Sequence, residues 1–264
     1  MAKRERVVYY TDERSDEFSG ITKNTVQVDG SFDYERKNPL WRLGRFFAYR
    51  VIMKPVAYVY CRVKFSLKVK NRKILKPYRK QGYFVFANHT LMAGDAFIPN
   101  LLDFGRACSV VVHADNISTP GFKNFVLMCG ALPLPTEPSG LRNFLASLRS
   151  RYESGQTLVV YPEAHIWPYC DFVRDFSDVS FAYPVRLGAP VFTSTVTYSK
   201  KRFGRTPRVT VYVDGPFFPD GELGLRSAQK KLRDEAYGAM CARAKQSSYS
   251  PIKYIKREEV QSDE

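Results

Sequence analysis

The sequence is poor in residues that bind metals or form disulfides. Its five cysteines lie far apart, with no C-x-x-C pair and no histidines at ligand spacing, so neither a zinc site nor a disulfide framework is expected. We expect buried, unpaired thiols at all of these positions, which are Cys61, Cys108, Cys129, Cys170 and Cys241. The sequence therefore predicts a protein without a bound metal ion.

Long apolar segments are also missing. No run approaches the roughly 20 consecutive apolar residues that a membrane-spanning helix requires. The basic start of the chain is not followed by the apolar region of about 7 to 15 residues that marks a secretory signal. We therefore expect a protein that stays in the cytoplasm and does not cross a bilayer by a simple helix.

Several familiar motifs are absent, and acidic residues are few. No G-x-S-x-G elbow, H-E-x-x-H pair or P-loop is present, so the common nucleophile, zinc and nucleotide chemistries lack support. The 41 Lys and Arg exceed the 26 Asp and Glu by 15, and such an excess attracts nucleic acid, anionic lipid surfaces or phosphorylated small molecules. Because no RNP-like, zinc-finger or helix-turn-helix signature accompanies the charge, we expect an anionic membrane surface as partner, and no nucleic acid.

The composition predicts one domain with short tails. The 264 residues suffice for one large α/β domain, and no Gly/Ser- or Pro-rich linker divides them. Residues 1–37 are polar and without clear period, so we predict a loosely ordered arm there. A helical segment is expected over residues 38–61, the main domain over 62–250 and a tail over 251–264.

The segment 38–61 combines aromatic side chains with positive charge. Asn38 and Pro39 suit the start of a helix, and dense apolar residues follow until Pro55 interrupts the pattern. Between the apolar residues lie Arg42, Arg45, Arg50 and Lys54. A basic amphipathic helix of this kind lies at membrane surfaces, with its cations at anionic head groups and its rings at the acyl boundary. The alternative is a helix that packs on the domain's own core, with solvated arginines.

Apolar runs predict the strands of one sheet. Period-two alternation over residues 63–69 is typical of a half-buried strand with a basic outer face. Further strands are expected at residues 83–87, 108–112, 157–161, 190–197 and 208–213. Helical stretches alternate with them at residues 95–104, 139–153 and 225–245. This order is typical of the α/β class, a single domain with a mixed, mostly parallel sheet flanked by helices.

One histidine lies close to a carboxylate. His89 follows the predicted strand 83–87, and Asp95 comes six positions later. Ligands of open α/β sheets bind beyond the carboxyl ends of strands, so His89 is placed to be a general base and Asp95 its orienting partner. On one continuous helix the two side chains would point about 240° apart. The pair therefore needs a non-helical turn, which Gly94 can provide; helix capping is the alternative role of Asp95.

A second cluster of polar residues ends the predicted strand 157–161. Within Tyr161-Pro162-Glu163, the glutamate is suited to hold a substrate hydroxyl by charge-assisted hydrogen bonds. A solvated turn residue is the alternative interpretation of this glutamate. His165 lies two positions beyond this glutamate. His113 follows another predicted strand, and we expect a structural role for His113.

These two clusters together resemble the glycerophospholipid acyltransferase family, whose best-known members acylate lysophosphatidic acid. The family has four motif blocks in a fixed order: Asn-His with a downstream Asp, Gly-x-Ile-x-x-x-Arg, Phe-Pro-Glu-Gly, and a Pro-containing strand. They correspond here to residues 88–95, 130–136, 161–164 and 188–193. The resemblance covers about residues 80–200, and its first and third blocks are the specific ones.

The resemblance implies direct acyl transfer without a covalent enzyme intermediate. His89, oriented by Asp95, would take the proton from an acceptor hydroxyl that attacks an acyl thioester. Acyl-CoA or acyl-carrier protein would be the donor, lysophosphatidic acid the acceptor and phosphatidic acid the product, with no further cofactor. The acyltransferase domain would then be 62–250, on the cytoplasmic face of the membrane. Residues expected to bind substrate are Asn88, Thr90, Arg142, Tyr161, Pro162, Glu163 and His165.

The sequence departs from the family pattern at three points. Five residues, where the family usually has four, separate His89 from Asp95; Thr136 stands in place of the second block's arginine, and Ala164 in place of the third block's glycine. Replacements for the missing phosphate ligand are Arg142, Lys123, Arg174 or Arg186. Another lysolipid or glycerol phosphate is therefore an alternative acceptor. A non-catalytic basic protein that binds membranes or nucleic acid is the alternative from another class.

Overall fold

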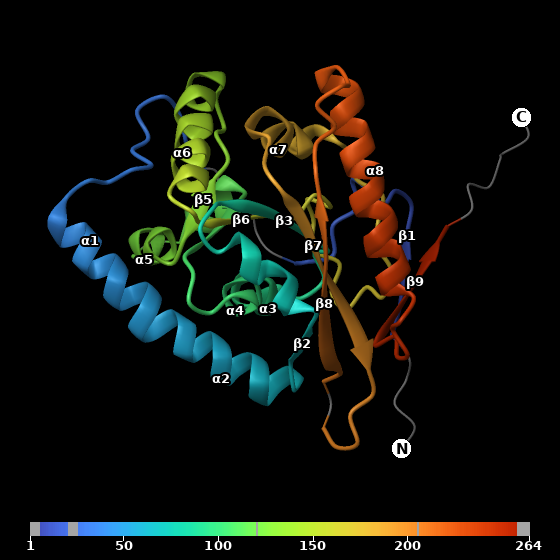
Figure 1. Cartoon of the computed structure of the whole chain (residues 1–264). Coiled ribbons are helices and arrows are strands. Elements are labelled where there is room, and N and C mark those ends of the chain that lie inside the picture. Colours follow the sequence, from blue (N-terminus) through green and yellow to red (C-terminus); the bar gives the residue numbers. More distant parts are fainter. Residues whose placement is uncertain (1–5, 21–25, 120, 205, 258–264) are drawn as a thin grey trace, which may run out of the picture.

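The fold is organised around a seven-stranded sheet with the order β2-β8-β7-β3-β6-β4-β5 (Figure 1). The computed structural model describes residues 6–20, 26–119, 121–204 and 206–257. All neighbouring strands pair in parallel except β7 and β8, which form an antiparallel hairpin. The predicted mixed, mostly parallel sheet is thereby confirmed. Its strands are β2 (Lys68–Lys70), β3 (Tyr83–Ala87), β4 (Cys108–Val112), β5 (Ala131–Pro133), β6 (Thr157–Val160), β7 (Val191–Ser199) and β8 (Arg208–Phe217).

The central strand β3 is buried along its whole length, because helices cover both faces of the sheet. Its side chains alternate between two hydrophobic clusters: Phe84 and Phe86 point into one, Tyr83 and Val85 into the other. The first cluster includes residues of α6 (Leu141–Glu153) and α8 (Leu225–Ala244) and lies near α7 (Ala182–Leu187). The second includes residues of α2 (Lys54–Phe65) and α4 (Pro99–Leu102), with α3 (Met92–Phe97) beside them (Figure 1). A continuous apolar run was the correct signal for this two-sided burial.

One long helical segment runs along the lower edge of the molecule in Figure 1, from Pro39 to Phe65. It consists of α1 (Pro39–Phe46), a π-helical part η1 (Phe47–Met53) and α2. The predicted helix is thus present, but the predicted interruption at Pro55 is wrong. Proline cannot donate a backbone hydrogen bond, and the helix widens just before it, with the Lys54 N–H donating to the Tyr49 carbonyl.

The strand predicted over residues 63–69 is wrong in its first half. Residues 63–65 are the last turn of α2, which ends at Ser66 in the left-handed conformation with φ 48°. The Leu67 N–H then donates to the Cys61 carbonyl, a helix-ending hydrogen bond. Only Lys68–Lys70 form a strand, because the same apolar residues fit both a helix face and a strand face over so short a window.

The two ends of the chain are more ordered than predicted. In the expected arm, β1 (Arg6–Tyr10) pairs in parallel with β9 (Ile252–Lys256) from the expected tail. Later in the arm, Val28 is buried in the main core and its N–H donates to the hydroxyl of Thr136. The arm therefore forms part of the folded domain over its described residues.

Lys54 is an exception among the basic residues of the long helix. Its side chain is buried, and its ammonium group donates to the carbonyl oxygens of Phe104 at 2.5 Å and Arg106 at 2.6 Å. Burial lowers the pKa of Lys54 to about 8. This lysine therefore fastens the helix to the body of the protein instead of facing a membrane.

Candidate active site

His89 and Asp95 meet directly after the carboxyl end of β3. The Nδ1 atom of His89 lies 2.8 Å from Oδ2 of Asp95, and the same oxygen accepts the Leu91 N–H at 2.8 Å. The histidine side chain is 18% exposed, whereas the aspartate side chain is 4% exposed. A buried carboxylate thus holds a partly exposed imidazole beyond the carboxyl ends of the strands. A general base requires this arrangement.

The non-helical turn between His89 and Asp95 is not formed at Gly94, where it was predicted. Leu91, before α3, is extended with φ −128° and ψ 101°, and α3 starts at Met92. Gly94 lies inside α3, where an added Cβ would come within 2.7 Å of the Leu91 Cβ. The turn that brings His89 onto Asp95 is therefore made by the residues before α3. Gly94 lets the helix pack closely against Leu91 and does not form the turn.

The electrostatics of the pair favour one tautomer of His89. Burial raises the pKa of the Asp95 carboxyl, and hydrogen bonds from His89 and the Leu91 N–H act in the opposite direction. An ionised carboxylate only accepts, so Nδ1 of His89 carries the hydrogen and Nε2 carries the lone pair. Nε2 forms no hydrogen bond with any residue in the described part of the chain. This nitrogen is the atom available to take a proton.

Tyr161 fixes the plane of the imidazole. Its ring stacks on His89 with centroids 4.4 Å apart and an interplanar angle of 26°. Its hydroxyl donates to the Asp95 carbonyl oxygen at 2.7 Å. Burial raises the pKa of Tyr161 well above its ordinary value, so the phenol keeps its proton and remains a donor. The predicted site residue Tyr161 is thus beside the pair, packed against it.

Glu163 has a different role from the substrate contact expected for it. Its side chain and that of Arg174 are both 0% exposed and lie 3.0 Å apart. Oε2 also accepts the His89 N–H at 2.9 Å, and Oε1 accepts the Arg174 N–H at 3.0 Å. Protein groups therefore occupy both carboxylate oxygens, and Glu163 positions the backbone of His89.

Asn88 and Thr90, also expected to bind substrate, hold the loop after β3 against β7. The Asn88 side chain accepts the Val196 N–H at 2.8 Å and donates to the Val196 carbonyl at 3.3 Å. The Thr90 hydroxyl lies 2.6 Å from the hydroxyl of Tyr198. Both residues are buried, so their side chains fix the backbone on either side of His89.

The remaining predicted site residues lie around this centre or away from it. Pro162 is half-buried between Tyr161 and Glu163. The His165 ring lies 3.6 Å from the Glu17 carboxylate. Arg142 is exposed in the first turn of α6, and none of its hydrogen bonds joins it to a described residue of the site.

The sequence did not predict which residues hold the loops after β3 and β6 together. Arg174 was expected only as a possible phosphate ligand, but its burial against Glu163 removes it from that role. Its guanidinium also donates to the His165 carbonyl and lies 4.7 Å from the centroid of Trp167. The signal available in the sequence was a lone arginine in an aromatic-rich stretch after the third block, which does not reveal its partner.

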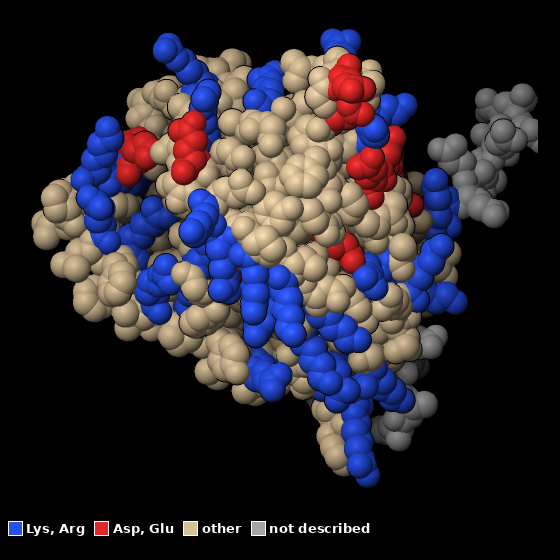
Figure 2. Space-filling view, viewed as in Figure 1, with Lys and Arg blue, Asp and Glu red and all other residues tan. Residues whose placement is uncertain are grey.

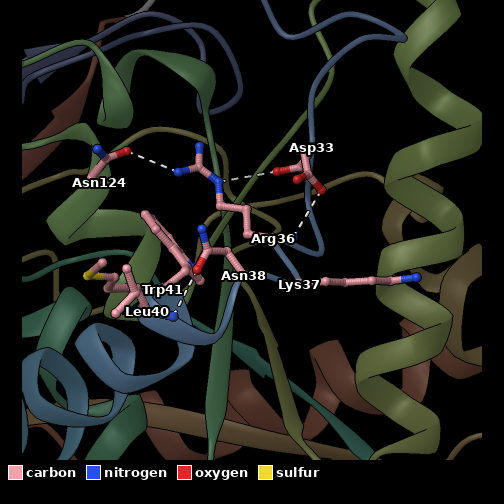
Figure 3. A pocket seen from close by; sticks show the side chains of 8 residues that line it. Asp33, Arg36, Lys37, Asn38, Leu40, Trp41 and Asn124 are labelled. Atoms are coloured by element: carbon pink, nitrogen blue, oxygen red, sulfur yellow. Dashed lines mark hydrogen bonds between the residues drawn. The ribbon is translucent and has the colours of Figure 1, made fainter.

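A hollow of about 570 Å³ lies elsewhere, at the start of α1. Figure 3 shows the Arg36 side chain over Trp41, with its guanidinium bonded to Asn124. The hollow is lined by Asp33, Arg36, Lys37, Asn38, Leu40, Trp41, Asn124 and Met128, and none of these is a predicted site residue. It is therefore separate from the His89 centre.

The described residues contain neither a candidate metal centre nor a candidate membrane-spanning helix. Among them, no group of three or more His, Cys, Asp or Glu side chains is arranged to hold a metal ion. None of their helices combines the length and the apolar character needed to cross a membrane.

Comparison with known proteins supports the fold. No protein-family model matches the chain, and no curated protein matches it in sequence. Among solved structures, the chain is similar to the 1-acyl-sn-glycerophosphate (LPA) acyltransferase PlsC from Thermotoga maritima. The two share 17% sequence identity with a TM-score of 0.56, and the match covers 82% of this chain and 86% of the other. The architecture expected from the sequence motifs is thereby confirmed.

We predict that Glu163→Gln destabilises the protein. The glutamine would leave Arg174 buried without a countercharge and would place its amide NH2 group against at least one of the N–H donors that the carboxylate now accepts from, at a cost of about 3–5 kcal/mol in the free energy of unfolding. Urea unfolding measures this loss. The matched control is Glu153→Gln, which breaks an exposed ion pair with Arg149 and should leave stability nearly unchanged. Equal stability of the two variants would contradict the role of the buried Glu163–Arg174 pair in holding the loops.

We predict that the effect of Asp95→Asn on stability depends on pH. Because the folded-state pKa of Asp95 is raised, the ionised carboxylate costs stability above that pKa, and the cost vanishes below the ordinary Asp value of about 3.9. The stability of the variant relative to wild type should therefore improve as the pH rises from 4 to 7. Thermal unfolding at both pH values measures the difference, with the exposed Asp234→Asn as control. A change in the opposite direction would contradict the burial argument.

Proposed function

We propose that this chain is an acyltransferase of glycerophospholipid synthesis. It would move a fatty acyl group from acyl-CoA or acyl-carrier protein to the free hydroxyl of lysophosphatidic acid and give phosphatidic acid. The observation that carries the proposal is the hydrogen bond between His89 Nδ1 and Asp95 Oδ2 at 2.8 Å, beyond the end of the central strand. The fold shared with an acyltransferase structure supports the same reaction class.

The geometry suits direct transfer between two bound substrates. Nε2 of His89 takes the proton of the acceptor hydroxyl while that oxygen attacks the thioester carbonyl carbon. The tetrahedral intermediate then expels the thiolate by breaking the C–S bond, and the imidazolium returns its proton to the sulfur. Asp95 stabilises the imidazolium and keeps the tautomer fixed. A general base contributes about 10² to 10⁴ in rate, and orientation of the substrates supplies much of the remainder.

The acceptor's phosphate has fewer candidate ligands than the sequence offered. Thr136, which replaces the family's arginine, uses its hydroxyl to accept the Val28 N–H, and Arg174 is buried against Glu163. Exposed alternatives are Arg142, Lys123 and Arg186. This difference keeps another lysolipid or glycerol phosphate as the second candidate acceptor.

We predict that His89→Ala abolishes acyl transfer, because it removes the base and the group that protonates the leaving thiol. Purified protein with labelled acyl-CoA or acyl-carrier protein and a panel of lysolipids and glycerol phosphate measures the activity. We expect wild-type transfer to be fastest to lysophosphatidic acid and the variant to be at least about 10²-fold slower. His113→Ala, which removes an exposed histidine paired with Asp115, is the matched control.

Full activity of His89→Ala would contradict the mechanism. No transfer by the wild type to any acceptor would favour a non-catalytic basic binding protein.

We also propose that the protein binds the cytoplasmic face of the membrane as a peripheral protein. One face of the helix 39–65 packs on the core through residues such as Met53, Ala57 and Cys61. Its other face is an apolar stripe of exposed side chains, which are Leu40, Leu43, Phe46, Phe47, Val51, Ile52, Val56, Tyr58, Val59 and Val63. Exposed Arg42, Arg50, Arg62 and Lys64 flank this stripe. The packed face supports the alternative of a helix on the domain's own core, and the exposed stripe supports the proposed membrane contact.

We predict that a triple substitution of Phe47, Ile52 and Val59 by Ser weakens flotation with vesicles that contain phosphatidylglycerol. These side chains lie in the apolar stripe, so burial of their area in lipid would be lost without disturbing the packed face. The control replaces Val179, Leu223 and Leu225 by Ser, three exposed apolar residues outside the stripe. Equal flotation of the two triple variants would rule out the stripe as the membrane contact.

A further inference from the structure

We propose that the tip of the β7–β8 hairpin is a second membrane-binding element, which contacts the same anionic lipid surface as the apolar stripe. This inference rests on the proposed peripheral membrane association. The hairpin tip comprises the described residues 200–204, 206 and 207, between the end of β7 and the start of β8. It projects from the lower edge of the molecule in Figure 1, on the side where α2 ends.

The composition of the hairpin tip matches a lipid interface. Residues 200–205 read Lys-Lys-Arg-Phe-Gly-Arg, and no Asp or Glu occurs between Asp178 and Asp214. Phe203 is 80% exposed, and the Arg202 guanidinium lies 5.4 Å from the centroid of its ring. An aromatic ring surrounded by cations at the end of a hairpin can enter the acyl boundary while the cations stay at anionic head groups.

Hydrogen bonds hold the hairpin tip beside the end of the stripe. The Lys201 ammonium donates to the Lys64 carbonyl at 2.5 Å, and the Thr206 hydroxyl donates to the same oxygen at 2.6 Å. That oxygen lies in the last turn of α2, next to Val63, which is 75% exposed and is the last residue of the stripe. The hairpin tip and the stripe are therefore fixed relative to each other and can meet one surface together.

The charge around the hairpin tip selects an anionic partner. Figure 2 shows a band of Lys and Arg side chains across one face of the molecule, which continues down to the hairpin tip. Exposed cations of β2 and the adjoining segment η2 (Arg72–Tyr78) are Lys68, Lys70, Arg72, Lys73 and Lys76. Because apolar side chains accompany the charge at the hairpin tip and in the stripe, a bilayer fits this surface better than nucleic acid, which offers no acyl boundary.

The test compares hairpin variants by vesicle flotation. Phe203→Ser removes the ring, and a double variant, Lys200→Ser with Arg202→Ser, removes two cations. We expect the double variant to bind phosphatidylglycerol vesicles roughly 30-fold more weakly, because the attraction of two cations to an anionic surface is lost. The control, Arg226→Ser with Lys230→Ser, removes two exposed cations from α8 and should float as wild type does.

A fluorescent reporter distinguishes insertion from mere charge attraction. Phe203→Trp in a Trp41→Phe background leaves only the buried Trp167 as a second indole. We expect a blue shift of the emission with phosphatidylglycerol vesicles and none with heparin. An unchanged emission with vesicles, or an equal shift with heparin, would overturn the proposal.

The outcomes separate the hairpin tip from the proposed function. If the hairpin variants float with vesicles as wild type does while the stripe variant no longer floats, the second element is refuted and peripheral membrane association stands. If the hairpin variants lose vesicle binding but retain acyl transfer to a short-chain, water-soluble acceptor, the hairpin tip is a membrane contact and the enzyme is intact. Full vesicle binding by all variants would contradict both surfaces.

Discussion

The buried ion pair between Glu163 and Arg174 is the interaction on which the site depends. Glu163 follows β6 and His89 follows the neighbouring β3, and the carboxylate joins the two loops by accepting the His89 N–H. Further backbone bonds run between the same loops, from the Trp167 N–H to His89 and from the Tyr169 N–H to Thr90. A buried pair recovers its desolvation cost only when its remaining hydrogen bonds are satisfied. Here those bonds are used to fix the position of His89.

Strands with continuous apolar runs and the contact between two residues close in sequence were predictable from the sequence. The limits of β3 and β4 agree with their apolar runs. The expected contact of His89 with Asp95 required a non-helical turn between them, and both are present. The location of that turn could not be read, because a glycine such as Gly94 serves equally for a turn and for close packing inside a helix. The alternating residues 63–69 were ambiguous for a related reason, since so short a window fits both a helix face and a strand.

Roles that depend on contacts between distant segments were not predictable. Asn88 and Thr90 were expected to bind substrate because of the family resemblance, and Glu163 because a carboxylate beyond a strand end suits a substrate hydroxyl. Their partners are Val196, Tyr198 and Arg174, which no local pattern connects to them. The folded position of the arm was missed in the same way, because β1 is stabilised by β9 from the other end of the chain. Sequence spacing gave the residue types of the site but not the direction of their side chains.

The pair of His89 and Asp95 lies close to the proposed membrane surface. The helix α3, which carries Asp95, contacts α2, and the opposite face of α2 carries the apolar stripe. A helix with its side chains is about 10–12 Å wide, so in the proposed function the acceptor's hydroxyl would have a short path from the lipid surface to His89. Rigid loops at a fixed distance from the bilayer would then let a lipid acceptor and a thioester donor meet at one nitrogen atom.

Direct transfer without an acyl-enzyme is the claim that one measurement tests most directly. The protein is incubated with acyl-CoA alone, and thiol release and the intact mass of the protein are followed before and after addition of lysophosphatidic acid. The account predicts an unmodified mass and no thiol release until the acceptor is added, followed by release equal to the acylated lipid formed. A stoichiometric release of thiol with an acyl group on the protein, before any acceptor is present, would contradict it.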